Sequence, residues 1–315
     1  MTKKIFAVLL ILGAGCLGTP EQPENLLPSP ETGMIDWLLP DAIKVGTGAD
    51  AESSIDVSPD GQTILICSHG GFTQPSPLWV STDGGAKFTQ VTPEPNQPFN
   101  GDCDVSIAVD GTWSIVYDTV ASATVAVSTD KGASWSVNPV TAYAFIGGVD
   151  RPWIHTVDED TLYLTYKSVG GGQPELDIFA ISNDAGLTWI QEPYFVPEPP
   201  ERTSAIPGDM WVSEDGRTVR VPFLVSGDGE GGESVENAVS RDGGATFTRE
   251  PITSVASANG IPSGDRADDS TLFFGYGAAS GDVGDVMVVY SKDDGKTWSD
   301  PMPVSSNETF GGLLN

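Results

Sequence analysis

Carboxylates, tryptophans and arginines precede several strand-like runs in this sequence, and these residue types suit binding or cleavage of a saccharide. Four aspartates are the candidate acids: Asp104, Asp150, Asp209 and Asp265. Two carboxyl groups, one acting as an acid and the other as a base or nucleophile, suffice to cleave a glycosidic bond. The candidate ligand-binding residues, which could stack on sugar rings or bond to ligand oxygens, are Trp153, Trp211, Arg151 and Arg266.

The elements that must position these residues repeat along the chain. The pattern Ser-x-Asp-x-Gly-x-x-Trp/Phe occurs five times at intervals of about 50 residues, which is typical of a repeat architecture. Each copy joins two alternating apolar runs, so we expect a tight turn between two strands. In that turn the Asp accepts bonds from nearby amides and the Gly adopts a positive φ. We therefore assign a structural role, and not catalysis, to the five aspartates of the pattern: Asp83, Asp130, Asp184, Asp242 and Asp293.

Two further strand-like runs precede each turn. In the second unit they are residues 104–109 and 112–117, separated by Asp110-Gly111. Four short antiparallel strands in one repeat make a propeller blade, and no segment of the mature chain has a helical period. The sequence therefore predicts an all-β propeller over residues 43–315. Residues 42–45 look like a lone strand before the first blade, and residues 310–315 look like the start of another. We expect a chain that is truncated at its C-terminus and has six blades when intact.

The repeated turn resembles the Asp-box, or bacterial neuraminidase repeat, of the sialidase superfamily of propellers. The resemblance covers roughly residues 45–305. It implies a sialidase-like β-propeller, but the same box occurs in sialidases, other glycoside hydrolases, sorting receptors and photosystem assembly factors. The resemblance therefore indicates the fold and leaves the function open.

In propellers the ligand usually lies over the central channel, at the face where the innermost strands begin and opposite the box turns. The residues that we expect on this rim precede the innermost strands: Glu52, Asp56, Asp102, Asp104, 150–153, 209–211 and 265–269. Loops between the second and third strands would add His69, Tyr117, Asp118, Lys167, 228–233 and Tyr276. An alternative role for the rim acids is structural, either as solvated charge or as bonds between neighbouring blades.

Three functions remain open. A sialidase of this superfamily needs an arginine cluster, a Tyr nucleophile activated by a Glu, and an Asp acid/base. Tyr276 is a further candidate catalytic residue. Only Arg151 and Arg266 fall on the expected rim, however, and the Phe/Tyr-Arg-Ile-Pro motif is missing ahead of the first box. An acidic rim also repels an anionic sugar acid. The second function is hydrolysis of a neutral glycan by the rim carboxylates. The third, which we favour, is a surface module that binds glycan or protein.

The N-terminus predicts export and lipid anchoring. Residues 1–16 have two lysines, a short apolar core and small residues before Cys16, as in a lipoprotein-type signal peptide. Cys16 is the expected lipidation residue, and the proline-rich residues 17–42 are the expected tether. We therefore expect a cell-surface protein attached to the membrane through its lipid only.

Charge and metal-binding residues limit the partners further. The formal net charge of −29 disfavours a nucleic-acid partner. With only His69 and His155 and no cysteine cluster, a zinc site is not expected. The acidic loops 228–233 and 265–269 group oxygen ligands suited to Ca²⁺ without the spacing of a known calcium loop, so no cofactor is predicted. Cys67 and Cys103 could form a disulfide in an exported chain, and buried thiols are an equally good alternative.

Overall fold

The computed structural model describes residues 43–45, 51–69, 76–93, 101–119, 121–143, 148–170, 176–195, 202–227, 233–255, 258–267, 270–280 and 283–304. The elements in these ranges are β-strands, as the alternating apolar runs predict, apart from 3₁₀ geometry at Tyr143. Within them, no helix has the length and hydropathy of a membrane-spanning segment.

In the described ranges, twenty-one strands form five antiparallel sheets, each made from one stretch of chain. Blade 1 consists of β1 (Ala51–Val57), β2 (Ile64–His69), β3 (Leu78–Ser81) and β4 (Thr89–Val91). Blade 2 consists of β5 (Cys103–Ile107), β6 (Trp113–Asp118), β7 (Ser122–Ser128) and β8 (Ser136–Thr141). Blade 3 consists of β9 (Gly148–Thr156), β10 (Leu162–Val169), β11 (Leu176–Ser182) and β12 (Ile190–Phe195).

Blades 4 and 5 complete the set. Blade 4 consists of β13 (Arg202–Pro207), β14 (Trp211–Val212), β15 (Val219–Gly227), β16 (Glu233–Ser240) and β17 (Thr248–Val255). Its inner strand is divided, because β13 and β14 both pair with β15. Blade 5 consists of β18 (Ala258–Arg266), β19 (Leu272–Ser280), β20 (Val283–Ser291) and β21 (Met302–Pro303).

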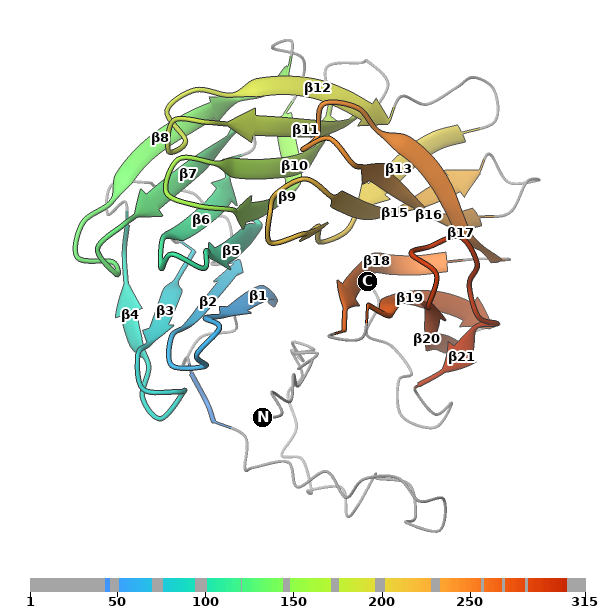
Figure 1. Ribbon diagram of the computed structural model, residues 1–315, viewed down its shortest axis with the longest axis horizontal. Helices are drawn as coiled ribbons and strands as arrows, with labels where there is room; N and C mark the ends of the chain where they lie inside the picture. The colour runs from blue at the N-terminus through green and yellow to red at the C-terminus, as the bar shows by residue number, and fades with distance from the viewer. Residues whose placement is uncertain are drawn as a thin grey trace.

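The five blades lie along an arc with their first strands toward a common centre, and blades 1 and 5 stand at its two ends (Figure 1). A buried apolar cluster fills each space between successive blades, from Leu65, Val105 and Trp113 between blades 1 and 2 to Leu224, Phe274 and Val289 between blades 4 and 5. Burial of these facing sheets is the main force that holds the repeats together. The structure is thus a five-bladed β-propeller of the sialidase-like type, as predicted.

The repeated boxes form the turns between the third and fourth strands of each blade. In blade 2, Ser128 Oγ donates to Asp130 Oδ1 over 2.9 Å, and the Gly132 and Ser134 amides donate to Ser128 Oγ and Asp130 Oδ1 over 2.8 Å each. Gly132 has φ +81° and Lys131 has φ +57°, so two successive residues are left-handed. The same bonds from serine and aspartate recur in the other four boxes. In all five boxes the aspartate thus accepts hydrogen bonds within its turn, and a purely structural role for these aspartates stays a prediction.

Three strand predictions were wrong. Residues 43–45 form no strand. Blade 4 begins at Arg202, and Pro207 interrupts its first strand because a proline cannot donate a ladder hydrogen bond. Blade 5 begins at Ala258, so Asp265 and Arg266 end its first strand instead of preceding it.

Several predictions fall on residues outside the described ranges. They concern Cys16, the tether 17–42, the acidic loop 228–232 and Asp268 and Asp269. A sixth blade and a truncated C-terminus stay predictions.

Candidate functional site

The two faces of the propeller carry different features: the box turns lie on one face and a cluster of charged residues lies on the other. The box turns lie beside the turns that join first and second strands, since the Gly84 amide donates to Gln62 O over 2.9 Å and the Gly243 amide donates to Arg217 O over 2.8 Å. We call this the box face. The opposite face, where the innermost strands begin, holds a cluster of charged residues from blades 1 to 3. We call this cluster the channel mouth and define it as Glu52, Asp102, Asp118, Asp150 and Arg151.

Two residues of the channel mouth have strained backbones. Glu52 has φ +50° and Arg151 has φ +52°, a region that non-glycine residues rarely adopt. The register of β1 with β2 shifts between Ala51 and Ser54, and that of β9 with β10 shifts between Thr165 and Lys167. Bulges of this kind re-aim side chains, and strained residues cluster at functional sites. The distortions thus direct a carboxylate and a guanidinium toward the same place.

Glu52 and Asp102 form a hydrogen-bonded pair of carboxyl groups across blades 1 and 2. Burial, then the hydrogen bond and charge of Glu52, raise the pKa of Asp102 to about 8. The hydrogen bond from Asp102, and then the charges of Arg151 and His69, lower the pKa of Glu52. Asp102 is therefore the protonated partner and donates to an ionised Glu52 at neutral pH. One acid and one base stand side by side.

Asp118 and Asp150 bring further carboxylates to the pair. The ligand oxygens of Asp102, Asp118 and Asp150 all lie within 4.8 Å of one another. Asp118 is buried, and its burial followed by the charge of Asp150 raises its pKa to about 7. Three carboxylates this close can hold a cation with oxygen preference, such as Ca²⁺. These residues differ from the two acidic loops that the sequence suggested for Ca²⁺.

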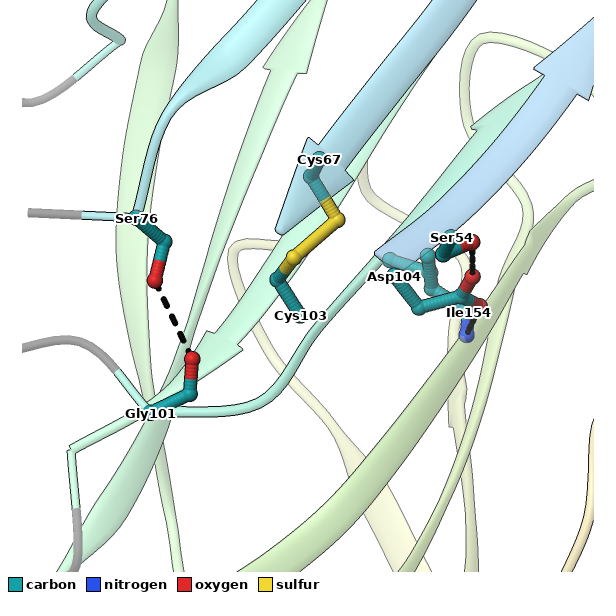
Figure 2. Close-up of a disulfide and its surroundings, with 7 residues drawn as sticks. All are labelled: Ser54, Cys67, Ser76, Gly101, Cys103, Asp104 and Ile154. Atoms are coloured by element: carbon teal, nitrogen blue, oxygen red, sulfur yellow. Dashed lines mark hydrogen bonds between the residues drawn. A yellow bond between two sulfur atoms is a disulfide. The ribbon is translucent and has the colours of Figure 1, made fainter. Parts of the chain in front are cut away.

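Asp104 joins three blades and is not free for chemistry. It is 3% exposed; it accepts the hydroxyl of Ser54 in blade 1, and its Oδ2 accepts the Ile154 amide of blade 3 over 2.7 Å (Figure 2). The adjacent Cys103 forms a disulfide with Cys67, with 6.2 Å between the Cα atoms. Of the two alternatives for the cysteines, the disulfide is thus the one observed. Asp104 takes the structural role that the sequence left open for rim acids.

We expect stability to fall as pH rises through the titration of Asp104. Burial raises its pKa to about 7, so the folded state binds a proton that the unfolded state releases near pH 4. Stability then declines between these two values, by at most about 1.4 kcal/mol per pH unit for one group. Asp104→Asn can still accept the Ile154 amide, and its melting temperature should decline less between pH 5 and 8. Parallel melting curves with an identical decline would contradict this assignment.

Three other predicted site residues, Asp209, Asp265 and Trp153, lie away from the channel mouth. Asp209 lies between β13 and β14, and burial followed by the charges of Asp104 and Asp56 raises its pKa well above the usual range. Asp265 lies near Asp56 at the box end of the inner strands, with a pKa raised by burial. Trp153 Nε1 donates to Pro207 O of blade 4 over 3.1 Å, and its ring packs into the core between blades 3 and 4. These residues do not join the channel mouth.

Three predicted positions are corrected. Arg266 Nη1 lies 4.0 Å from Asp294 Oδ1 of the fifth box, and its guanidinium stacks over Trp211 at 5.4 Å. Both residues therefore lie toward the box face, because Arg266 ends β18 and Trp211 is in the last part of the inner strand of blade 4. Tyr276 is 4% exposed and packs between blades 4 and 5, so it is no surface nucleophile. Only Asp150 and Arg151 of the predicted site lie at the channel mouth.

Glu52, Asp102 and Asp118 were among the expected rim residues but were not singled out. One signal in the sequence could have found two of them. In blades 1 to 3, the amide that closes the first turn belongs to Ser58, Ala108 and Val157, respectively. The residue at the same distance before each of these amides is Glu52, Asp102 and Arg151, respectively. An alignment of the repeats on that turn, instead of on the box, places the three side chains at one level.

No family model and no curated protein matches the chain. Its solved structural neighbours include the α-L-arabinofuranosidase of Fusarium graminearum in complex with an iminosugar inhibitor, with TM-score 0.55, 15% identity, and coverage of 78% of this chain and 79% of that one. An ulvan lyase bound to a GlcA–Rha3S saccharide has TM-score 0.55, 12% identity and coverage of 82% and 70%. The NanB sialidase of Streptococcus pneumoniae has TM-score 0.55, 11% identity and coverage of 84% and 64%. The chain therefore has the fold of the sialidase-like propellers.

Proposed function

We propose that this protein binds carbohydrate at the channel mouth, as an exported propeller anchored to the cell surface by a lipid on Cys16. The observation that supports it is the convergence of Glu52 and Arg151, both on strained backbone, with the carboxyl group of Asp102. Carboxylates and a guanidinium on a rigid sheet are the groups that fix hydroxyl-rich ligands. The excess of carboxylates favours a neutral saccharide over an anionic one.

The structural neighbours are consistent with this proposal. The arabinofuranosidase binds an iminosugar inhibitor, and the ulvan lyase binds a saccharide. Because identities of 11–15% establish the fold alone, the ligand class is inferred from the residues of the channel mouth.

Hydrolysis of a glycoside is the second candidate, and one observation favours it. Glu52 and Asp102 are a carboxylate and a carboxylic acid whose pKa values are driven apart by their surroundings. A glycosidase needs a protonated acid, but its second carboxylate stands about 5–9.5 Å away across the bond, so the directly bonded Glu52 would position the proton of Asp102 and another carboxylate would have to complete the pair. Asp102 would donate the proton to the leaving oxygen, and an ionised carboxylate of the cluster would act on the other side of the bond.

A glycan array combined with a panel of chromogenic glycosides tests both candidates. Saturable binding without sugar release supports the binding module. Release that is lost in both Glu52→Gln and Asp102→Asn supports the hydrolase. Absence of both binding and release across neutral glycans would overturn the proposed function.

We expect Arg151→Ala to weaken binding of an array-identified glycan by roughly 10- to 150-fold, which corresponds to about 1.5–3 kcal/mol for a charge-assisted hydrogen bond. Titration calorimetry measures the change. The control is Arg217→Ala, an exposed arginine in the first turn of blade 4. If Arg151 only offsets repulsion among the carboxylates, the variant will lose melting temperature and keep its affinity.

The anchoring part of the proposal has its own test. Cys16→Ser removes the thiol to which the lipid is attached, so the variant should leave the membrane fraction with its signal unprocessed. Retention equal to that of the wild type would exclude lipid anchoring at Cys16.

A further inference from the structure

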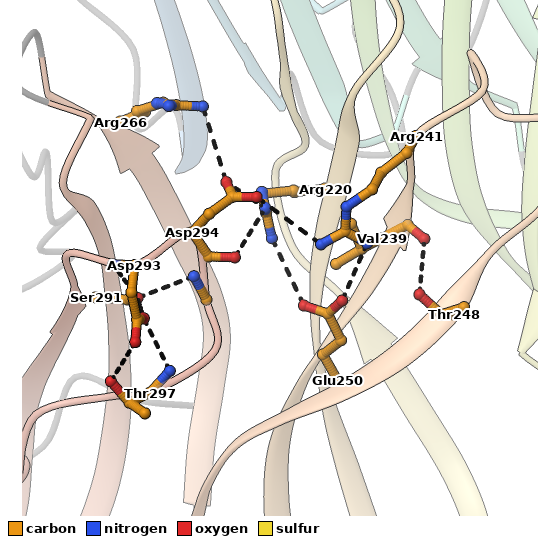
Figure 3. A network of polar contacts seen from close by, with 11 residues as sticks. Arg220, Val239, Arg241, Thr248, Glu250, Arg266, Ser291, Asp293, Asp294 and Thr297 are labelled. Atoms are coloured by element: carbon orange, nitrogen blue, oxygen red, sulfur yellow. Dashed lines mark hydrogen bonds and ion pairs between the residues drawn. The ribbon is translucent and has the colours of Figure 1, made fainter.

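The interior between blades 4 and 5 contains a fully buried charge. Arg220 on β15 is 0% exposed and reaches across the interface to the fifth box. Its Nη2 donates to Asp294 Oδ1 over 2.8 Å and to Asp294 O over 3.3 Å. Arg241 and Arg266 approach the same carboxylate from the box face (Figure 3). Asp294 thus accounts for one nitrogen of the Arg220 guanidinium.

The other two nitrogens of Arg220 have no hydrogen-bond partner among the described residues. These are Nε and Nη1, and both are buried. Nη1 is 3.8 Å from Glu250 Oε2, which is too long for a direct hydrogen bond. A polar separation above 3.5 Å raises the question of a water between the two groups.

Asn237 presents a second unpartnered side chain on the same face of blade 4. Its amide Oδ1 and Nδ2 are buried without a partner, and the residue is 0% exposed. In the sheet it lies opposite Glu250 on β17 and opposite Pro222 on β15, two positions along from Arg220. Paired residues and their i+2 neighbours share one face of a sheet, so Asn237, Glu250 and Arg220 all face blade 5.

We propose that an internal water molecule binds between blades 4 and 5, held by Arg220, Asn237 and Glu250. Water accepts from an N–H of Arg220 Nη1 and donates to Glu250 Oε2 and Asn237 Oδ1. It therefore has the two to four polar partners that a buried water requires. A halide would satisfy the donors only, and it would lie beside the carboxylates of Glu250 and Asp294. The binding site is independent of the channel mouth, and it makes the contact between the last two blades a hydrated one.

Oxygen-17 magnetic relaxation dispersion, which counts water molecules held for longer than nanoseconds, tests this proposal. Asn237→Leu removes two hydrogen-bonding atoms and fills their volume with an apolar side chain. The dispersion amplitude should fall by the contribution of one long-lived water relative to the wild type. The control is Asn138→Leu, the same substitution at an asparagine whose side-chain bond to Ser136 is exposed, and its amplitude should not change.

A crystal structure of the unaltered protein gives a second measurement that does not depend on the folding of a variant. It should show a peak within hydrogen-bond distance of Arg220 Nη1 and Asn237. Equal dispersion amplitudes in both variants and the wild type would overturn the proposal. So would a direct Asn237–Arg220 bond that excludes water, or an anomalous peak at this position after a bromide soak.

Discussion

Asp294→Ala is expected to lower the free energy of unfolding by about 2 kcal/mol, since it leaves the fully buried guanidinium of Arg220 without its nearest carboxylate, which is itself 47% exposed. Arg220 is fully buried, and its 2.8 Å bond to Asp294 is the only side-chain hydrogen bond described for it. Glu250 remains at 3.8 Å and compensates part of the charge. Urea unfolding followed by tryptophan fluorescence measures the change.

Two control variants distinguish loss of the Arg220–Asp294 ion pair from disruption of the box turn. Lys131→Ala makes the same kind of change at the same left-handed position of the second box, where no buried charge depends on it, and should cost no more than about 0.5 kcal/mol. Arg220→Met in the Asp294→Ala background removes the stranded charge and should recover part of the stability. Equal losses in Asp294→Ala and Lys131→Ala would show that the pair contributes nothing.

Replacement of both cysteines of the disulfide by alanine is expected to lower the free energy of unfolding by about 3 kcal/mol. The crosslink closes a loop with a sequence separation of 36 residues and restricts the unfolded chain. It also joins blades 1 and 2 between Asp102 and Asp104, which bond to Glu52 and Ser54 across the same boundary. The Cys67→Ala/Cys103→Ala variant should therefore also bind a glycan ligand more weakly.

Chemical reduction provides the matched control. Reductant should destabilise the wild type to the level of the double-alanine variant and should not affect that variant. Hydrogen exchange should accelerate first at the inner strands of blades 1 and 2. A variant with unchanged stability and exchange would show that the disulfide is dispensable.

The sequence predicts most of this fold because its strongest signals are local. The box turns and the paired strands of blade 2 depend on serine, aspartate and glycine at fixed spacing and on alternating apolar residues, and both formed as predicted. The first strands of blades 4 and 5 were misplaced because their local sequence signal is weak. The segment Asn259-Gly260-Ile261-Pro262-Ser263-Gly264 has no clear alternation, yet it pairs with β19 and forms most of β18. Its neighbours in the sheet, and not its own propensity, make it a strand.

The candidate site was less accessible to sequence reasoning, for a different reason. Glu52 and Asp102 lie far apart in the sequence and meet only because blades 1 and 2 stack in register. The left-handed backbone at Glu52 and Arg151 accompanies register shifts between the first two strands of blades 1 and 3. No residue type in the sequence indicates these shifts. Arg266 was assigned to the wrong face because the first strand of blade 5 was expected to begin after it, whereas that strand ends at it. Such an error moves a side chain from one face of the propeller to the other.

Bonds between the inner strands also bear on the order in which the blades unfold. Asp104 bonds to blades 1 and 3, the Ile107 amide donates to Asp56 Oδ2 over 2.6 Å, and the Thr156 amide donates to Ser106 Oγ over 3.0 Å. Together with the disulfide, these bonds are expected to make blades 1 to 3 one cooperative foldon, whereas the partly exposed Arg241–Asp294 ion pair between blades 4 and 5 should weaken with salt. We therefore expect partial opening to begin at blade 5. The channel mouth lies wholly in the foldon that opens last, so ligand affinity should outlast the detachment of the final blade.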